Sequence, residues 1–154
     1  MNTDKTTGTL TDILKGTKPE KAGEYLAENE DALLEKERPF AAYMRSVLRK
    51  RSLRQQDVFL AADISDGYGY KLLSEEKHTR QRDTILRLCF GGHFTLTEVQ
   101  RALRIYGMSP LYPRVPRDAV LIIAFNTGMY RIPEVNELLS DHGMEPLRPA
   151  SQNE

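Results

Sequence analysis

Several features that would assign a protein to a particular class are missing from this sequence. The 154 residues include no tryptophan and a single cysteine, Cys89, so no disulfide can form within one chain. A lone cysteine is typical of proteins in a reducing compartment, and we expect a cytoplasmic location. No apolar run approaches the length of about 18 residues that a membrane span needs, and no charged-then-apolar leader opens the chain. We therefore expect no contact with a membrane.

Groups that could support catalysis or bind a metal ion are also scarce. The three histidines, His78, His93 and His142, lie far apart along the chain, and we expect each to have a structural or solvent-exposed role. Cys89 lies in an apolar segment, where a thiol usually packs without reacting. There is no glycine-rich phosphate loop, because Gly91-Gly92 is explained by a turn between helices. We predict a protein that is not an enzyme, with no catalytic residue, metal ion or cofactor.

Charge is balanced overall but unevenly distributed. The chain carries 22 Lys and Arg and 22 Asp and Glu, a formal net charge of zero. Residues 1–38 contain 6 basic and 9 acidic residues, residues 39–90 contain 10 and 6, and residues 91–154 contain 6 and 7. The excess of positive charge is therefore confined to residues 39–90.

The most informative pattern present is an internal duplication. Residues 82–111 read RDTILRLCFGGHFTLTEVQRALRIYGMSPL, and residues 117–147 read RDAVLIIAFNTGMYRIPEVNELLSDHGMEPL. One extra residue in the second copy, placed near Asn126, aligns the two copies. A period of about 35 residues is the length of one helix–turn–helix hairpin, so we expect two stacked helical hairpins.

Local signals predict that both copies are helical. Thr95 and Glu98 have the spacing of a capping box at a helix start. Residues 119–125 are seven consecutive apolar residues and could by length form a buried strand, but the matching residues 84–90 are amphipathic, so we predict helices in both. In the second copy we expect three apolar side chains to be buried: Val120, Ile123 and Phe125.

An Arg-Asp pair opens each copy, as Arg82-Asp83 and as Arg117-Asp118. A repeated pair of this kind could belong to an active site. The interpretation we favour is structural: each aspartate lies at a helix start, where negative charge is stabilising, and each arginine bonds across to the neighbouring hairpin.

Three helices are predicted before the duplication. Apolar residues spaced at i, i+3, i+4, i+7 and i+8 predict a helix that begins near Pro39. A second helix should begin at residue 52 or 53, and a third should cover residues 66–74, although glycines at 67 and 69 lower its helix propensity. The inward positions of the second helix would be Val58, Ala61 and Ala62.

These three helices carry the pattern of a helix-turn-helix. The run Leu53-Arg54-Gln55-Gln56-Asp57-Val58, the turn at Ile64-Ser65 and the short helix from Tyr68 to Leu73 resemble the lambda-repressor-like, or XRE, family of bacterial transcriptional regulators. The resemblance covers roughly residues 39–147. It implies an all-α fold, in which a helix-turn-helix core is followed by a second, repeated helical hairpin. It also implies sequence-specific binding of double-stranded DNA and regulation of transcription.

The sequence departs from the family pattern where DNA would be read. Glu75 stands where the family has a glycine after its recognition helix, and Phe59 stands where it has a small alanine. Residues 66–71 contain no Arg, Asn or Gln, the residues that most often read guanine and adenine edges. The resemblance therefore predicts the fold more directly than the activity.

The candidate DNA-binding residues lie at the end of the first helix, the start of the second and along the third, which approach DNA in this docking geometry. They are Arg49, Lys50, Arg51, Arg54, Gln55, Gln56, Tyr68, Tyr70 and Lys71. The alternative is that the basic residues form a solvated face that complements the acidic residues 1–38. In that case the protein would be a non-enzymatic adaptor in a bacterial regulatory complex, with a protein partner in place of DNA. Either function is compatible with a homodimer.

We divide the chain into four parts. Residues 1–38 form an amino-terminal arm with short helices, frayed to about Thr9, with a capping box at residues 17–20. Residues 39–111 form the helix-turn-helix domain, residues 112–147 an additional helical hairpin packed on it, and residues 148–154 a disordered tail.

Overall fold

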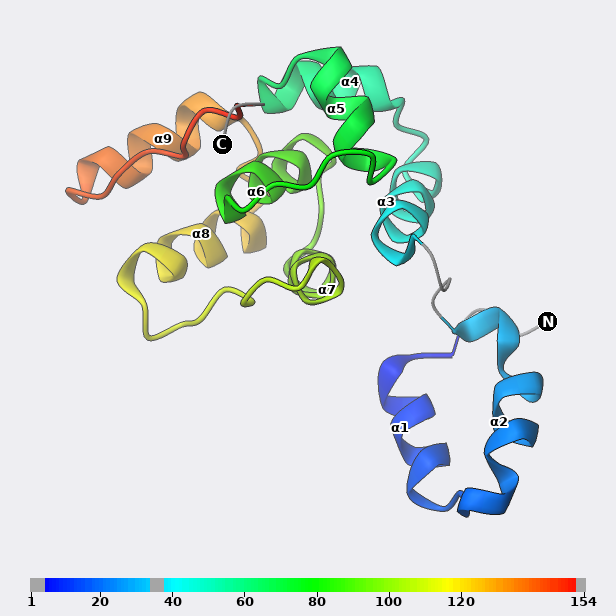
Figure 1. The fold of residues 1–154 in the computed structure, drawn as a ribbon. Coiled ribbons are helices and arrows are strands. Elements are labelled where there is room, and N and C mark those ends of the chain that lie inside the picture. Colours follow the sequence, from blue (N-terminus) through cyan, green and yellow to red (C-terminus); the bar gives the residue numbers. More distant parts are fainter. Residues whose placement is uncertain (1–4, 34–37, 152–154) are drawn as a thin grey trace. The chain divides into compact units, whose positions relative to one another are not determined.

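A computed structural model describes residues 5–33 and 38–151 of the chain (Figure 1). These residues form helices joined by loops, and no strand occurs among them, so the prediction of an all-α protein is confirmed. None of the helices in this part of the chain is long and apolar enough to cross a membrane. The chain divides into two compact units, Met1–Glu37 and Arg38–Glu154. The first four and last three residues, which belong to the predicted frayed start and disordered tail, lie outside the described residues.

The first unit is a helical hairpin. Its helices are α1 (Thr7–Lys15), η1 (Pro19–Lys21), α2 (Ala22–Glu28) and η2 (Glu30–Ala32), and α1 and α2 run antiparallel (Figure 1). Helix α1 begins at Thr7 because Thr6 accepts a hydrogen bond from Thr9 N at 3.1 Å, so the prediction of fraying to Thr9 is wrong for residues 7–9. The capping box at residues 17–20 does not form either. The Thr17 hydroxyl instead donates to the Ile13 carbonyl at 2.8 Å.

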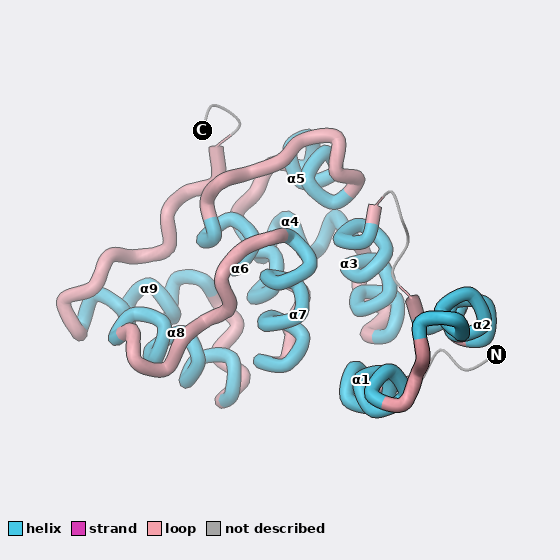
Figure 2. Tube along the Cα trace, turned by 60° about the horizontal axis from the view of Figure 1, so that its bottom comes forward, coloured by secondary structure: helices cyan, strands magenta, loops and turns pink. Residues whose placement is uncertain are grey.

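The second unit contains seven helices among its described residues. They are α3 (Pro39–Lys50), α4 (Gln55–Ala62), α5 (Asp66–Leu73), α6 (Arg82–Gly91), α7 (Leu96–Tyr106), α8 (Pro116–Asn126) and α9 (Ile132–Asp141). Helix α6 is central: it lies between α4 on one side and α7 and α8 on the other in both views (Figures 1 and 2), and every residue from Asp83 to Gly91 is buried. One continuous apolar core joins all seven helices.

Two residues of α6 fix the position of α4. A Cβ added to Gly91 would lie 2.6 Å from the Val58 carbonyl oxygen, so only glycine permits the two backbones to come this close. The Arg87 side chain is 4% exposed and donates to the Ala62 carbonyl at 3.1 Å. Burial lowers the pKa of the Arg87 guanidinium, while the carboxylates of Asp63 and Asp83 act in the opposite direction.

Arg87 also binds the carboxy-terminal segment. It donates to the carbonyls of Leu147 at 2.9 Å and Arg148 at 2.7 Å. The Arg148 N–H in turn donates to Asp83 at 2.9 Å. The prediction of a disordered tail is therefore wrong for Arg148, because its N–H and its carbonyl are both hydrogen-bonded.

The Arg-Asp pairs at the starts of α6 and α8 exchange partners between the two copies. Arg117 donates to both oxygens of Asp83, at 3.0 and 2.9 Å, and Arg82 makes the corresponding two bonds to Asp118, one of them at 3.2 Å. Both aspartates are buried, at 8% and 2% exposed. The prediction that each arginine bonds across to the other hairpin is confirmed.

The surrounding bonds match in the same way. Arg82 also donates to the Ser109 carbonyl and Arg117 to the Glu145 carbonyl, at 3.3 and 3.0 Å. Asp118 accepts from the Tyr112 N–H at 2.9 Å, as Asp83 does from Arg148. The amides of Gln100 and Asn136, at matching positions, each accept from the leucine N–H that closes their copy, at 2.8 Å.

Contacts of this kind define how the copies associate. Phe90 and Phe125, at matching positions, stack on each other with ring centroids 3.9 Å apart and planes 9° apart. Because like meets like and the Arg–Asp bonds are reciprocal, the copies associate as the halves of an isologous dimer do. Successive repeats of a one-way stack would not reciprocate.

The structure places the extra residue of the second copy differently from the alignment. A residue with positive φ follows each helix: His93, at φ +57°, follows α6, and Gly128, at φ +72°, follows α8. In each copy the N–H of the next residue donates to a carbonyl in the last turn of that helix, so His93 and Gly128 occupy matching positions. Asn126 therefore matches Gly91, and the extra residue is Tyr130, just before the N-cap Arg131.

On α8 and α4, the buried side chains differ in part from those that the apolar periodicity predicted to be buried. Phe125 is buried as predicted and Val120 is half-buried, but Ile123 is 55% exposed, because α8 is covered on one side only. On α4 the Phe59 ring enters the core where Ala61 was predicted to, and Ala61 is exposed. Helix α4 begins at Gln55 rather than at residue 52 or 53, because Ser52 adopts φ +55° and ends α3.

Replacing Arg117 with Ala should lower the free energy of unfolding by about 3 kcal/mol, because the buried Asp83 carboxylate loses the guanidinium that pairs with it. Urea unfolding followed by circular dichroism measures the change. Arg131→Ala is the matched control: Arg131 pairs with Glu134 at 3.3 Å, but its side chain is 78% exposed, so its loss should change the value by less than about 1 kcal/mol. Equal effects of the two substitutions would contradict a structural role for the exchanged pairs.

Candidate nucleic-acid interface

Helices α4 and α5 are joined by a three-residue turn. Asp63 ends α4 in the left-handed conformation, at φ +56°, and the Ile64 N–H donates back to the Phe59 carbonyl at 3.0 Å. Ile64 is buried, and Ser65 precedes the first residue of α5 in an extended conformation. The buried isoleucine and the left-handed residue before it set the angle between the two helices.

Phe59 and Gly69 fit each other. The Phe59 ring is completely buried, and a Cβ added to Gly69 would lie 2.5 Å from it. Gly69 weakens the intrinsic propensity of α5 by about 1 kcal/mol relative to alanine, but it provides the space that the large side chain at position 59 needs. The Tyr70 and Phe59 rings pack edge to face, with centroids 4.9 Å apart and planes 84° apart. Tyr70 is thereby held on the outer side of α5 with 45% of its surface exposed.

Glu75 follows α5 with φ +62°, the conformation that favours glycine. Its carboxylate accepts a hydrogen bond from the Ala41 N–H, in the first turn of α3, at 3.2 Å. Negative charge at a helix start is stabilising, which offsets the backbone strain of about 1–2 kcal/mol. The Glu75 side chain is therefore engaged by α3 rather than free beside α5.

Two of the predicted DNA-binding residues have other roles. Tyr68 is 3% exposed, so the prediction that it faces a DNA groove is wrong: it lies one turn before Leu72 on the inner face of α5. Arg51 forms two hydrogen bonds with Glu98, one of them at 3.1 Å, and its guanidinium lies 5.9 Å from the centre of the Phe94 ring. Arg51 therefore joins the end of α3 to the start of α7 and is not available to phosphate.

Glu98 is the centre of this contact. It completes the predicted capping box, which is confirmed: Thr95 N donates to Glu98 at 2.9 Å and Glu98 N to Thr95 at 3.2 Å. Lys50, whose side chain is 72% exposed, approaches the same carboxylate at 3.6 Å. Burial disfavours the charged form of Glu98, but hydrogen bonds from Arg51 and Thr95 outweigh burial and hold its pKa below the ordinary value.

The remaining candidates lie on α3, α4 and α5 or just before α4, and most of them are exposed. Gln55 and Tyr70 line a hollow of about 220 Å³ together with Arg45 of α3 and with Leu73, Ser74 and Glu76. Arg45 and Arg49 are one helical turn apart on α3, and both are exposed. Lys71, next to Tyr70, is half-buried.

The start of α4 carries the other two candidates. Arg54 is the N-cap but makes no side-chain cap bond, so the first N–H groups of α4 keep their capacity to bind an anion. Its guanidinium pairs with Asp57 at 2.9 Å in an exposed contact of the kind that contributes little stability. Gln56 is exposed and donates to Asp66 of α5 at 3.4 Å. We call the following residues the α3–α5 face: Arg45, Arg49, Arg54, Gln56 and Tyr70, which are exposed, and Gln55 and Lys71, which are half-buried.

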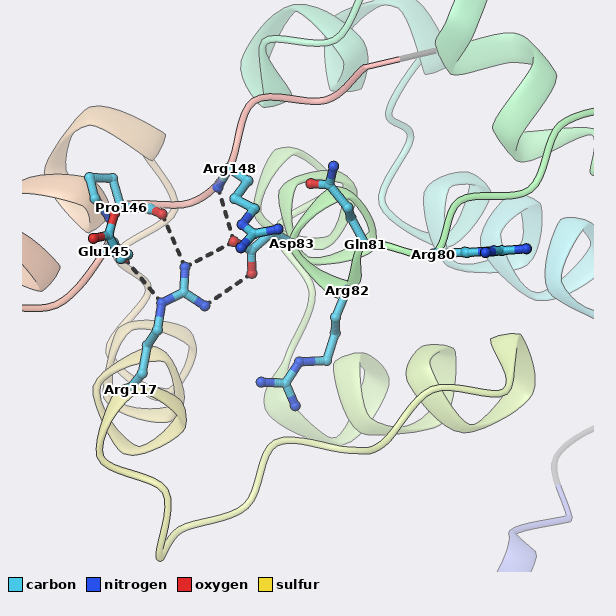
Figure 3. Close-up of a pocket in the computed structure, with 8 residues that line it drawn as sticks. All are labelled: Arg80, Gln81, Arg82, Asp83, Arg117, Glu145, Pro146 and Arg148. Atoms are coloured by element: carbon cyan, nitrogen blue, oxygen red, sulfur yellow. Dashed lines mark hydrogen bonds and ion pairs between the residues drawn. The ribbon is translucent and has the colours of Figure 1, made fainter. Parts of the chain in front are cut away.

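A second hollow, of about 410 Å³, lies at the start of α6 and contains four arginines (Figure 3). Arg117 points at Asp83 and at the carbonyls of Glu145 and Pro146 in this view, so its donors are already used within the fold. Arg82 is likewise bound to Asp118. These two arginines therefore form a structural junction between the copies.

Cys89 is the only cysteine, and it is completely buried, which raises the pKa of its thiol. Among the described residues, no group of three or more His, Cys, Asp or Glu side chains could hold a metal ion. Comparison of the chain with protein-family models, with curated proteins and with solved structures finds no match.

Replacing Gly69 with Ala should destabilise the protein by about 1–3 kcal/mol, because the added methyl group would overlap the buried Phe59 ring. Gly67→Ala is the control in the same helix. A Cβ at position 67 has no neighbour within 4 Å, so this change should raise stability by up to about 1 kcal/mol. Thermal unfolding measures both. The double substitution Phe59→Leu and Gly69→Ala should be more stable than Gly69→Ala alone, and an additive loss would contradict the fit between the two side chains.

Replacing Glu98 with Gln should make the free energy of unfolding less dependent on pH. The folded-state pKa of Glu98 is depressed, so its stabilising effect is complete above the unfolded-state pKa and is lost as pH falls through the folded-state value. The difference between wild type and Glu98→Gln should therefore be largest near pH 7 and shrink below about pH 4. Glu134→Gln makes the same substitution at the matching position of the second copy, in an exposed pair, and is the control for the effect of the substitution itself. A difference for Glu98→Gln that stays constant with pH would refute this assignment.

Proposed function

We propose that the protein is a non-enzymatic, sequence-specific DNA-binding regulator that contacts double-stranded DNA through the α3–α5 face. The observation that carries the proposal is that Arg45, Gln55 and Tyr70, from three successive helices, line one hollow beside the uncapped start of α4. In a helix-turn-helix that binds DNA, this part of the motif meets the phosphate backbone and the major groove. The sequence resemblance supports the same orientation.

The residues of this face would divide into two groups. Arg45, Arg49 and Arg54 supply positive charge, and the first amides of α4 add hydrogen-bond donors for phosphate. The Arg54–Asp57 pair is exposed, so phosphate can replace Asp57 at small energetic expense. Tyr70 and Lys71 would be the side chains of α5 that reach base edges. Since α5 has no Arg, Asn or Gln, phosphate contacts should supply more of the affinity than base contacts.

A specific observation favours the second candidate function, a protein-interaction adaptor. Leu60 of α4 is 82% exposed. Asp57 of α4 and Asp66 of α5 place negative charge on these two helices. An exposed leucine beside carboxylates fits a protein surface better than a phosphate backbone. The two functions are separated by measuring DNA binding itself.

Replacing Arg54 with Ala should weaken binding to all duplexes alike and reduce the slope of log affinity against log salt by about one unit. The experiment selects a duplex from a random pool and measures affinity by fluorescence anisotropy across a salt series. Arg131→Ala is a close control. Like Arg54, Arg131 is an N-cap that pairs with a carboxylate three residues later, and the two side chains are nearly equally exposed, at 78% for Arg131 and 77% for Arg54. It lies on α9, outside the α3–α5 face, and should leave the slope unchanged.

Replacing Tyr70 or Lys71 with Ala should instead reduce the preference among sequences, by about 1–3 kcal/mol for each good base contact that is lost. Absence of duplex binding by the wild-type protein at low salt would reject the DNA proposal. Leu60→Asp should then abolish capture of a protein partner if the adaptor proposal is correct.

A further inference from the structure

The two junctions between the copies are built from the same bonds, and each lines a hollow. We call the Arg117–Asp83 pair with its hollow of about 410 Å³ the first junction. The Arg82–Asp118 pair with its hollow of about 630 Å³ is the second junction. In both, the arginine donates to the carbonyls of the two residues before the leucine that closes a copy, and the aspartate accepts from the N–H of the residue after that leucine. The backbone around the two junctions therefore has the same role in the fold.

Three polar side chains line the first hollow without being used by the fold. Arg80 and Arg148 are exposed, and their guanidinium groups form no ion pair or hydrogen bond with another described residue. The Gln81 amide lines the hollow too, and its Oε1 atom is buried without a hydrogen-bond partner in the described part of the chain. The residues at the matching positions of the second junction are Val115, Tyr112 and Pro116.

The fold does not require polar groups at these three positions, because a valine, a tyrosine and a proline serve at the second junction. The polar groups leave the first hollow with an excess of positive charge. Arg82 and Arg117 are paired with aspartates, and among the lining residues the Glu145 carboxylate is the one left to offset the guanidinium groups of Arg80 and Arg148. Like charges gathered in one hollow repel each other, and a bound anion would remove that repulsion.

The side chains come from two segments that are far apart in the sequence. Arg80 and Gln81 precede α6, and Arg148 belongs to the carboxy-terminal segment that the Asp83 carboxylate holds by its N–H. Figure 3 shows the side chains of Arg148 and Gln81 on the same side of the α6 start. Arg80 points away from them in this view and would turn toward a bound anion, which its exposure and its lack of a partner allow.

A phosphate group fits this set of donors. Guanidinium groups bind phosphate through two parallel hydrogen bonds, and a phosphate monoester at pH 7 carries a charge of about −1.5 to −2 on three terminal oxygens. Three oxygens can accept from Arg148, Gln81 and Arg80 together, whereas a carboxylate has two oxygens and one charge. The volume of about 410 Å³ is within the range of roughly 300–1,000 Å³ that is usual for small-molecule sites.

We propose that the first hollow binds a small phosphate, either inorganic phosphate or a small phosphate monoester, through Arg148, Gln81 and Arg80. The proposal is independent of DNA binding, because none of these residues belongs to the α3–α5 face.

Isothermal titration calorimetry of the full chain with inorganic phosphate and, separately, with ribose 5-phosphate tests the proposal. At least one of the two should bind at one site per chain, and the tighter of them identifies the source of the phosphate group. Ribose, which lacks the phosphate, should not bind. Arg148→Ala should weaken binding at least about 10-fold, and Arg148→Lys, which keeps the charge but not the planar pair of donors, should weaken it less.

Arg104→Ala is the matched control, because Arg104 is an exposed arginine that lines the hollow of the second junction. It should leave phosphate binding unchanged. Since the Arg148 side chain makes no bond within the described fold, Arg148→Ala should also leave the melting temperature of the phosphate-free protein unchanged. A loss of binding in this variant is then a loss of contact with phosphate and not of folded protein.

Three results would overturn the proposal. One is the absence of saturable binding of both phosphate probes, including the case in which Arg148→Ala instead weakens binding to duplex DNA, since Arg148 would then contact the DNA backbone. Another is an equal loss of phosphate binding in Arg104→Ala and Arg148→Ala, which would indicate a general attraction of anions to surface arginines. The third is phosphate binding that survives Arg148→Ala and Arg80→Ala together, which would place the site elsewhere.

Discussion

The exchanged Arg–Asp pairs at the starts of α6 and α8 are the contact on which the rest of the second unit depends. They hold the two copies together, and the same Asp83 carboxylate that accepts from Arg117 also accepts from the Arg148 N–H. That bond holds the carboxy-terminal segment where Arg87 can reach it. Arg87 in turn donates to the last turn of α4. A chain of buried and partly buried hydrogen bonds thus runs from the duplicated hairpins to the helix-turn-helix.

Close packing transmits that constraint to the α3–α5 face. Gly91 allows α4 to lie directly on α6, and Gly69 allows α5 to lie on the Phe59 side chain of α4. Each glycine weakens its own helix but removes a methyl group that would separate two elements. Glu75 secures α3 to the end of α5 by a bond to the Ala41 N–H. The face that we propose for DNA is consequently held by side chains that would not touch DNA.

Local chemistry made part of this structure predictable. The capping box at Thr95 and the helical character of residues 119–125 follow from short-range patterns and from comparison of the two copies, and both are present. The exchange of Arg-Asp partners was predictable because the pair recurs at both helix starts. Burial of Tyr68 and exposure of Ile123 were not, because periodicity identifies an apolar face but not the element that covers it. The Arg51–Glu98 contact joins residues 47 positions apart, and no local pattern distinguishes that arginine from its exposed neighbours.

Hydrogen exchange of the full chain with and without a selected duplex would test the proposed function most directly, because it reports on every region at once. DNA bound to the α3–α5 face should slow exchange at the first amides of α4, residues 55–57, and along α5, while exchange in α9 stays the same. Protection confined to the α1–α2 hairpin or to α8 and α9, or no protection under conditions in which the duplex is bound, would contradict the account.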